Sequence, residues 1–307
     1  MTAAALVVRN RAAAREAGRA REIVAYAENL ADGITPSLDS GAAAAATRAA
    51  LTRGRRIVFL STRPGGVNLY ALDGDSAIEL ASNLALPAWS PDGRRIAFER
   101  DGDIMTIAPD GSDLRAVTSG PALDYEPDWS PDGRQIVFRS NRGGEDSDIW
   151  VMNADGSGAV NLTRRPGWDG HPDWSPDGRR IVFGSERGGN QEIYVMNRDG
   201  SDPRNLTRNP QMDIEPAWSP DGQQIAFVTI RDGNWEVYVM NADGSNQRNL
   251  TQHPAADGQP AWSPDGTMIA FSSNRRGNYD VFVMRADGTI LANLTRHAAD
   301  DAWPAWR

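Results

Sequence analysis

The sequence predicts an all-β protein: a six-bladed β-propeller of four-stranded blades, preceded by a short Ala-rich helical segment. Three observations predict this fold. The motif Trp-Ser-Pro-Asp-Gly occurs five times, its copies begin 40–45 residues apart, and apolar strand-like runs follow each copy. A period of this length with four short strands is typical of a propeller blade. The motifs begin at Trp89, Trp129, Trp174, Trp218 and Trp262, and Trp306 follows at the same spacing.

Each repeat contains four candidate strands, termed a to d in chain order. Strand a contains Pro-x-Trp-Ser. Strand b is Ile-x-Phe, as in Ile136–Phe138, and strand c is an apolar run such as Ile193–Met196. Strand d is Asn-Leu-Thr, as at Asn161. Ser-Pro-Asp-Gly suits a type I turn between a and b, and Asp-Gly suits the c–d hairpin. Strands b and c are apolar at successive positions, which indicates that neighbouring blades cover both sheet faces.

The two ends of the repeat region predict how the ring closes. Residues 55–82 hold strands b, c and d without a preceding strand a, whereas Pro304–Trp306 is a strand a with nothing after it. Pairing the C-terminal strand with the first three gives a 3+1 "velcro" blade and removes the open sheet edges. The predicted propeller domain therefore spans residues 54–307.

Residues 1–53 form a separate segment rich in Ala and Arg. Ile23, Tyr26 and Leu30 follow helical spacing, which predicts one or two helices. These could pack beside the propeller, form a partly disordered tail, or dock another chain. The first residues lack the basic region and long apolar core of a signal peptide, so a cytoplasmic location is the default expectation.

Composition narrows the function classes. The chain of 307 residues has no cysteine, which excludes disulfides, thiolate metal sites and a cysteine nucleophile. Its net charge of −9 argues against nucleic acid as a partner. No apolar stretch is long enough to predict a membrane span. The nucleophile motif Gly-x-Ser-x-Gly is absent, so no catalytic residue and no enzymatic activity are predicted.

The d–a and b–c loops of a propeller meet around one mouth of its channel, and both carry charged residues here. Converging aspartates at the ends of the d–a loops could bind Ca²⁺ through hard oxygen ligands. Alternatively, each could pair with the arginine that recurs in the b–c loops. The candidate calcium ligands are Asp124, Asp169, Asp213, Asp257 and Asp301, and the arginines are Arg63, Arg100, Arg142, Arg187, Arg231 and Arg275.

Variable residues at the same mouth are candidates for binding a ligand or partner. In the first set, each residue stands two positions after one of the candidate calcium ligands. The second set consists of aromatic residues in or near the loops, which suit recognition of a partner. The aromatics could instead cover the ends of neighbouring blades. The first set is Glu126, His171, Glu215 and Gln259, and the second is Tyr125, Trp168, Trp235, Tyr279 and Trp303.

The repeated Pro-x-Trp-Ser-Pro-Asp-Gly-x-x-Ile-Ala-Phe pattern, followed by Tyr-Val-Met and Leu-Thr, resembles the TolB-type propeller repeat over residues 54–307. The resemblance implies an electronegative channel able to take calcium and a periplasmic or secreted location. Similar repeats also occur in propellers attached to prolyl-oligopeptidase-type hydrolases. The α/β domain that precedes the propeller in TolB does not fit within residues 1–53.

The predicted function is a non-catalytic scaffold whose channel mouth binds a protein, peptide or small ligand, with Ca²⁺ as a candidate cofactor. Two alternatives remain open. One is a self-assembling structural protein. The other is a lyase or glycosidase that uses paired mouth carboxylates, which would require perturbed carboxylate pKa values.

Overall fold

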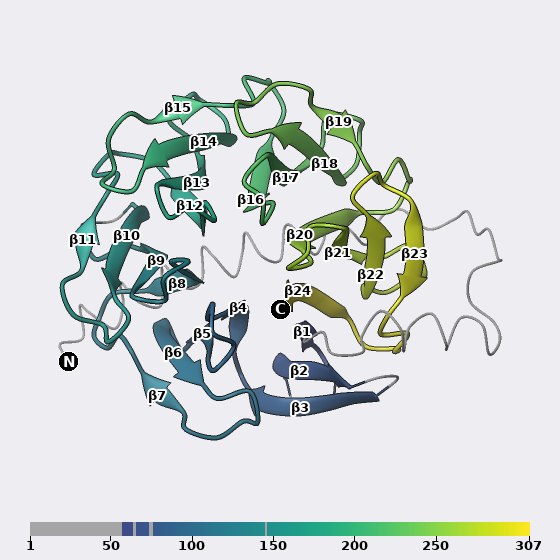
Figure 1. Cartoon of the computed structure of the whole chain (residues 1–307), viewed down its shortest axis with the longest axis horizontal. Helices are drawn as coiled ribbons and strands as arrows, with labels where there is room; N and C mark the ends of the chain where they lie inside the picture. The colour runs from purple at the N-terminus through teal and green to yellow at the C-terminus, as the bar shows by residue number, and fades with distance from the viewer. Residues whose placement is uncertain (1–56, 64–65, 74–75, 145) are drawn as a thin grey trace.

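The computed structural model of the protein describes residues 57–307 apart from residues 64–65, 74–75 and 145. The described chain is all β: six four-stranded antiparallel sheets stand around a central axis as propeller blades (Figure 1). The predicted fold class is confirmed. The predicted helices of residues 1–53 lie outside the described residues. Within the described part of the chain, no helix is long and apolar enough to cross a membrane.

The strands follow the predicted a-to-d order, and strand d is the shortest in most blades. They are β1 Ile57–Ser61, β2 Asn68–Asp73 and β3 Ser76–Ser82; β4 Ala85–Trp89, β5 Ile96–Arg100, β6 Asp103–Ile107 and β7 Arg115–Ala116; β8 Asp124–Trp129, β9 Gln135–Ser140, β10 Asp148–Asn153 and β11 Val160–Asn161; β12 Asp169–Trp174, β13 Arg180–Ser185, β14 Glu192–Asn197 and β15 Arg204–Asn205; β16 Asp213–Trp218, β17 Gln224–Thr229, β18 Glu236–Asn241 and β19 Arg248–Asn249; β20 Asp257–Trp262, β21 Met268–Ser273, β22 Asp280–Arg285, β23 Ile290–Asn293 and β24 Asp301–Trp306.

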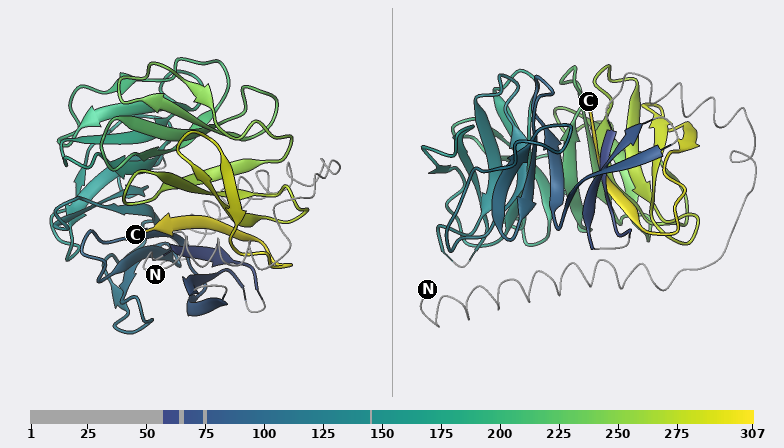
Figure 2. Two further views of the ribbon diagram at one scale, coloured as in Figure 1. Left: turned by 45° about the vertical axis from the view of Figure 1, so that its right-hand side comes forward. Right: turned by 90° about the horizontal axis from the view of Figure 1, so that it is seen from below.

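The ring closes as the sequence predicts. Strand β24 pairs antiparallel with β1, with Trp306 opposite Ile57, and the sheet order of this blade is β24-β1-β2-β3. In both views of Figure 2 the yellow C-terminal strand lies beside the blue first strand. This blade is termed the first, and the blades that begin with β4, β8, β12, β16 and β20 are termed the second to the sixth.

The core lies between neighbouring blades. Trp174, Ile181 and Phe183 of the fourth blade pack in one buried cluster with Val137 and Ile149 of the third. The phenylalanine of strand b is fully buried in every blade because a neighbouring sheet covers each face. Face-to-face burial of apolar surface therefore fixes the radial arrangement.

The turns have the predicted chemistry. In the a–b turn of the third blade, the Gly133 N–H donates to Ser130 O at 2.8 Å, and the Ser130 hydroxyl donates to Asp132 Oδ1 at 2.7 Å. In the c–d turn, Gly156 has φ +87°, and a Cβ added there would lie 2.1 Å from Val117 O of the preceding blade. Glycine is thus required both by the turn and by the close approach of two blades.

Candidate functional site: the central channel

The innermost strands enclose a cavity of about 420 Å³ along the propeller axis. In β12, β16 and β20, only the third and fifth residues are partly exposed, and their neighbours are buried. These two positions line the channel in all six blades. The third-position side chains, termed the bulge ring, are Leu86, Glu126, His171, Glu215, Gln259 and Trp303; the others, termed the inner ring, are Ala88, Asp128, Asp173, Ala217, Ala261 and Ala305.

A β-bulge in each strand a directs the bulge-ring side chains into the channel. In the fourth blade the register jumps from Gly170–Gly184 to Asp173–Val182, so His171 and Pro172 stand opposite one residue, Phe183. The proline suits a bulge because it cannot donate a ladder hydrogen bond. All six bulge-ring residues have φ between 50° and 57°, a region that is unfavourable for side chains other than glycine.

Hydrogen bonds between blades hold this left-handed backbone in place. The His171 N–H donates to Glu126 Oε2 at 2.6 Å, and the Gln259 N–H donates to Glu215 Oε2 at 2.9 Å. The Trp303 N–H donates to Ser272 Oγ at 3.1 Å. Such conformations cost about 1–3 kcal/mol each and persist where the surroundings fix them, often at ligand sites.

The two glutamates of the bulge ring have different electrostatic environments. Burial acts to raise the pKa of Glu126, but the Arg139 guanidinium and the neighbouring His171 lower it below its usual value. The Arg139 Nε lies 3.1 Å from Glu126 Oε1. Glu215 has no comparable ion pair among the described residues, so burial raises its pKa. The ion pair with Arg139 therefore stabilises the ionised form of Glu126, whereas the Glu215 carboxyl group ionises less readily.

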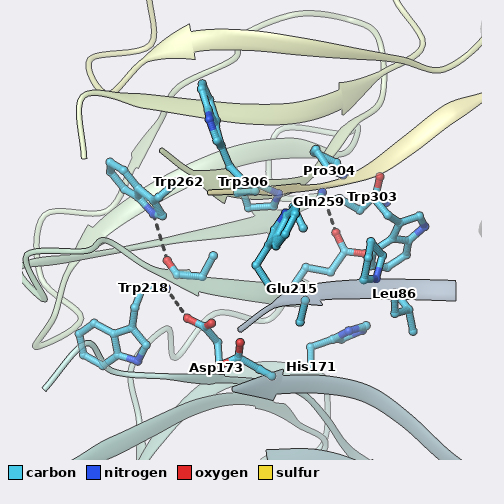
Figure 3. Close-up of a pocket in the computed structure, with 18 of the residues that line it drawn as sticks. Leu86, His171, Asp173, Glu215, Trp218, Gln259, Trp262, Trp303, Pro304 and Trp306 are labelled. Carbon is cyan, nitrogen blue, oxygen red and sulfur yellow. Dashed lines mark hydrogen bonds between the residues drawn. The ribbon is translucent and has the colours of Figure 1, made fainter. Parts of the chain in front are cut away.

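Three aromatic rings contact one another in sequence, from Trp168 through His171 to Trp303. Trp303 of the first blade stacks on His171 of the fourth, with ring centroids 6.4 Å apart, and Trp168 makes an edge-on contact with His171 at 5.3 Å. In Figure 3, Leu86, Trp303 and His171 lie at one end of the pocket and Trp218 and Trp262 at the other. The structure thus brings Trp168, Trp303 and His171 together, and the last two line the cavity.

The remaining predicted aromatics lie outside the channel lining. The Arg139 guanidinium lies 4.7 Å from the centre of the Tyr125 ring, and Trp235 is partly exposed in a b–c loop. Burial, with the nearby Glu215 and Asp257 carboxylates, raises the pKa of Tyr279 to about 12. None of these three aromatics is among the residues that line the cavity.

The five predicted calcium ligands do not converge on one point. Each sits at the buried start of strand a and forms an ion pair with the b–c arginine of its own blade, as the alternative interpretation predicts. The described residues contain no group of three or more His, Asp or Glu side chains arranged to hold a metal ion. Calcium binding therefore stays a prediction. The pairs are Asp124–Arg142 at 2.5 Å, Asp169–Arg187 at 3.1 Å, Asp213–Arg231 at 2.8 Å, Asp257–Arg275 at 2.9 Å and Asp301–Arg63 at 3.1 Å.

Sequence reasoning missed the two aspartates of the inner ring. Asp128 and Asp173 lie on the neighbouring strands β8 and β12, and their carboxyl groups interact electrostatically. Burial raises the pKa of Asp128 to about 6 and that of Asp173 well above its usual range, and the Asp128 charge adds to the effect on Asp173. The signal was present in the sequence: the middle residue of Pro-x-Trp is Ala in four blades and Asp in these two.

Known proteins share this architecture. The structure of TolB from Acinetobacter baumannii is 24% identical with a TM-score of 0.73, and the match covers 86% of this chain and 70% of that one. For TolB from Agrobacterium tumefaciens, the identity is 24%, the TM-score 0.64 and the coverage 78% and 89%. An oligogalacturonate lyase in complex with manganese is 17% identical, with a TM-score of 0.57 and coverage of 78% and 74%. Comparison with curated protein sequences finds no match.

The sequence also matches a family model directly. The TolB beta propeller domain model matches residues 144–214 and 205–307, which together exceed half of the chain. The structure supplies the features that such a repeat requires: four-stranded blades, the Trp-Ser-Pro-Asp-Gly turn and closure by the C-terminal strand. The chain belongs to the TolB β-propeller domain family.

Proposed function

We propose that the protein is a non-catalytic binding scaffold that receives a segment of a protein or peptide partner, or a small ligand, in its central channel. The observation that supports this most strongly is the bulge ring. Six equivalent backbone positions, all held at positive φ, carry six side chains of which only the two glutamates are alike. A uniform scaffold with a non-uniform lining suits recognition rather than structure alone. A periplasmic or secreted location belongs to the same proposal.

The channel lining also has two chemically different sides. The third, fourth and fifth blades contribute Glu126, His171 and Glu215, together with the inner-ring aspartates. The first and second blades contribute Trp303 and Leu86, above alanines. A cavity of about 420 Å³ falls within the range of about 300–1,000 Å³ that ligand sites occupy. The lining therefore favours a ligand with one cationic or polar side and one apolar side.

Selection from a display library of random peptides on the immobilised full chain tests this proposal. We expect enriched peptides to bind the wild type and to lose affinity for the Glu215→Gln, Trp303→Ala variant. The matched control is Glu79→Gln with Ile78→Ser, because both residues are exposed on strand β3 of the outer rim. Peptides that bind the channel variant as well as the wild type, or no enrichment at all, would contradict the proposal.

One observation favours a second candidate, acid–base catalysis by channel carboxylates. Catalysis of this kind needs carboxyl groups with raised pKa values, and burial raises the pKa of Glu215 and of both inner-ring aspartates. Incubation with oligosaccharides that contain neutral sugars or uronic acids tests it. Cleavage that disappears in the Asp128→Asn, Asp173→Asn variant would support catalysis, and uncleaved substrates at high protein concentration would argue against it.

A further inference from the structure

We infer that the groove between the second and third blades is a binding site for a primary carboxamide, the end of a glutamine side chain on a protein partner. The two blades are β4–β7 and β8–β11 in Figure 1. The groove has a volume of about 640 Å³ and shares no lining residue with the channel. The inference is therefore independent of the proposed channel function.

The corresponding place between the fourth and fifth blades shows which chemical group fits. There the carboxamide of Gln247 bridges the two blades. Its Oε1 accepts a hydrogen bond from Arg231 Nη1 at 2.6 Å. Its Nε2 donates to Gly244 O at 3.0 Å in the same blade and to Leu206 O at 3.2 Å in the fourth blade, and Thr207 O lies 3.5 Å away. One amide thus uses a cationic donor and main-chain acceptors from both blades.

The groove between the second and third blades has all four of these contact groups. The same local hydrogen bonds place them: Arg142, like Arg231, donates from Nη2 to the strand-initial aspartate of its blade. The Val117 and Leu206 N–H groups each donate at 2.8 Å to an isoleucine carbonyl oxygen of strand c. The counterparts of Arg231, Gly244, Leu206 and Thr207 are Arg142, Gly156, Val117 and Thr118, and all four line the groove.

The amide itself is what the third blade does not supply at this position. Ala159 precedes Val160, the first residue of β11, as Gln247 precedes the first residue of β19. Among the described residues, no group hydrogen-bonds to Arg142 Nη1, and none donates to the carbonyl oxygens of Val117 and Thr118. The groove therefore presents the donor and acceptors that bind Gln247 elsewhere, without a glutamine of its own.

These groups select a carboxamide over a charged group. A carboxylate would pair with Arg142 but would place an oxygen against the carbonyl oxygens of Val117 and Thr118. An ammonium or guanidinium group would donate to these oxygens but would be repelled by Arg142. A primary carboxamide accepts through its oxygen and donates twice through its nitrogen, so a single planar group satisfies both sides.

The groove is also accessible and large enough for a partner's side chain. Ser119 and Pro121, which line it, are exposed, and Ser119 replaces the longer Arg208 of the fourth blade. A volume of about 640 Å³ lies within the range of about 300–1,000 Å³ that ligand sites occupy. The groove can therefore take the methylene stem of a glutamine as well as its amide.

Nuclear magnetic resonance of the full-length ¹⁵N-labelled protein tests the inference with two probes. N-acetylglutamine methylamide and N-acetylglutamate methylamide differ only in the terminal group. We expect the glutamine probe to shift the signals of Val117, Thr118, Arg142 and Gly156 saturably at about pH 7. Its Kd should be about 1–10 mM, as expected for a molecule of this size. The glutamate probe should bind at least about tenfold more weakly.

The variant Ala159→Gln supplies the amide from the protein itself. Its side chain should fill the groove as Gln247 does, so the glutamine probe should no longer bind. The melting temperature should rise by about 2–4 °C. The matched control is Val160→Gln, because Val160 is 46% exposed and successive side chains of an extended chain point to opposite sides. This control should bind the probe as the wild type does.

Three results would overturn the inference. The first is the absence of saturable shifts with the glutamine probe up to about 100 mM, as expected if only water enters the groove. The second is equal affinity for the two probes, which would remove the preference for a carboxamide. The third is unchanged probe binding by Ala159→Gln, which would place the probe elsewhere. None of them affects the channel proposal, because the groove and the channel share no lining residue.

Discussion

Trp303 in the first blade stacks on His171 in the fourth, with ring centroids 6.4 Å apart and an interplanar angle of 25°. In a ring of six, these two blades face each other across the axis (Figure 1). The pair therefore spans the channel mouth, and it also links the strand that closes the ring to the opposite wall. Removing either ring should both widen the mouth and weaken this link.

A double-mutant cycle measures the contact between these two rings. We expect Trp303→Ala to lower the free energy of unfolding by about 1–3 kcal/mol, because Trp303 is only partly buried. Combined with His171→Ala, the loss should fall short of the sum by about 0.5–1.5 kcal/mol, the usual size of an aromatic pair. Urea denaturation of the four proteins supplies the values. Strict additivity would show that the stacking contributes nothing.

Closure by the last strand gives a second prediction. Trp306 is 9% exposed and packs with Ile57 and Phe59 of the first blade and with residues of the sixth, as Trp218 packs between two internal blades. Trp306→Ala should therefore cost about as much as Trp218→Ala, about 3–5 kcal/mol. Deletion of residues 303–307 should cost more and promote aggregation, because it exposes an edge of β1. A much smaller cost for Trp306→Ala would show that closure is weak.

The fold could be predicted because the same local chemistry recurs in each blade. The Ser-Pro-Asp-Gly turn, the buried Ile-x-Phe strand and the Asp-Gly hairpin each act over a few residues, and their spacing gives the blade number. Even the 3+1 closure follows, since Pro304–Trp306 is a strand a without a partner in sequence.

The site was only partly predictable because it depends on contacts between blades. Sequence placed Glu126, His171, Glu215, Gln259 and Trp303 at the mouth, and the structure places them in one ring. It did not identify the bulge that turns these side chains inward. Neither could it tell which partner each aspartate of a d–a loop would choose, since the arginine lies 18 residues away in sequence in four blades and 238 residues away for Asp301 and Arg63. The electrostatic interaction of Asp128 with Asp173 depends on two strands a of neighbouring blades lying side by side.

Calcium titration distinguishes the two interpretations of the strand-initial aspartates. Arg231 and Arg275 neutralise Asp213 and Asp257, so a calcium ion would have to displace a guanidinium at each position. We expect any heat of Ca²⁺ binding to be unchanged in the Asp213→Asn, Asp257→Asn variant. A heat that disappears in this variant would instead assign these residues as calcium ligands and show that the ion pairs open.

The inner-ring pair should make stability depend on pH in the direction opposite to an ion-paired aspartate. Burial raises the pKa of Asp128 to about 6 and that of Asp173 further, so the folded protein holds protons that the unfolded chain releases. The contribution of the pair is therefore complete below about pH 4 and is lost as pH rises through about 6. The rise of the Asp128 pKa to about 6 corresponds to about 2–3 kcal/mol of folding free energy.

Urea denaturation of the wild type and of Asp128→Asn, Asp173→Asn between about pH 4 and pH 8 measures this contribution. The two amides of this variant do not titrate in that range. The wild type should therefore lose stability relative to the variant by about 2–3 kcal/mol as pH rises. The control variant Asp199→Asn, Asp202→Asn, which removes two exposed carboxylates of a c–d turn, should follow the wild type. A difference that stays constant over this range would show that folding does not raise the pKa values of the two carboxyl groups.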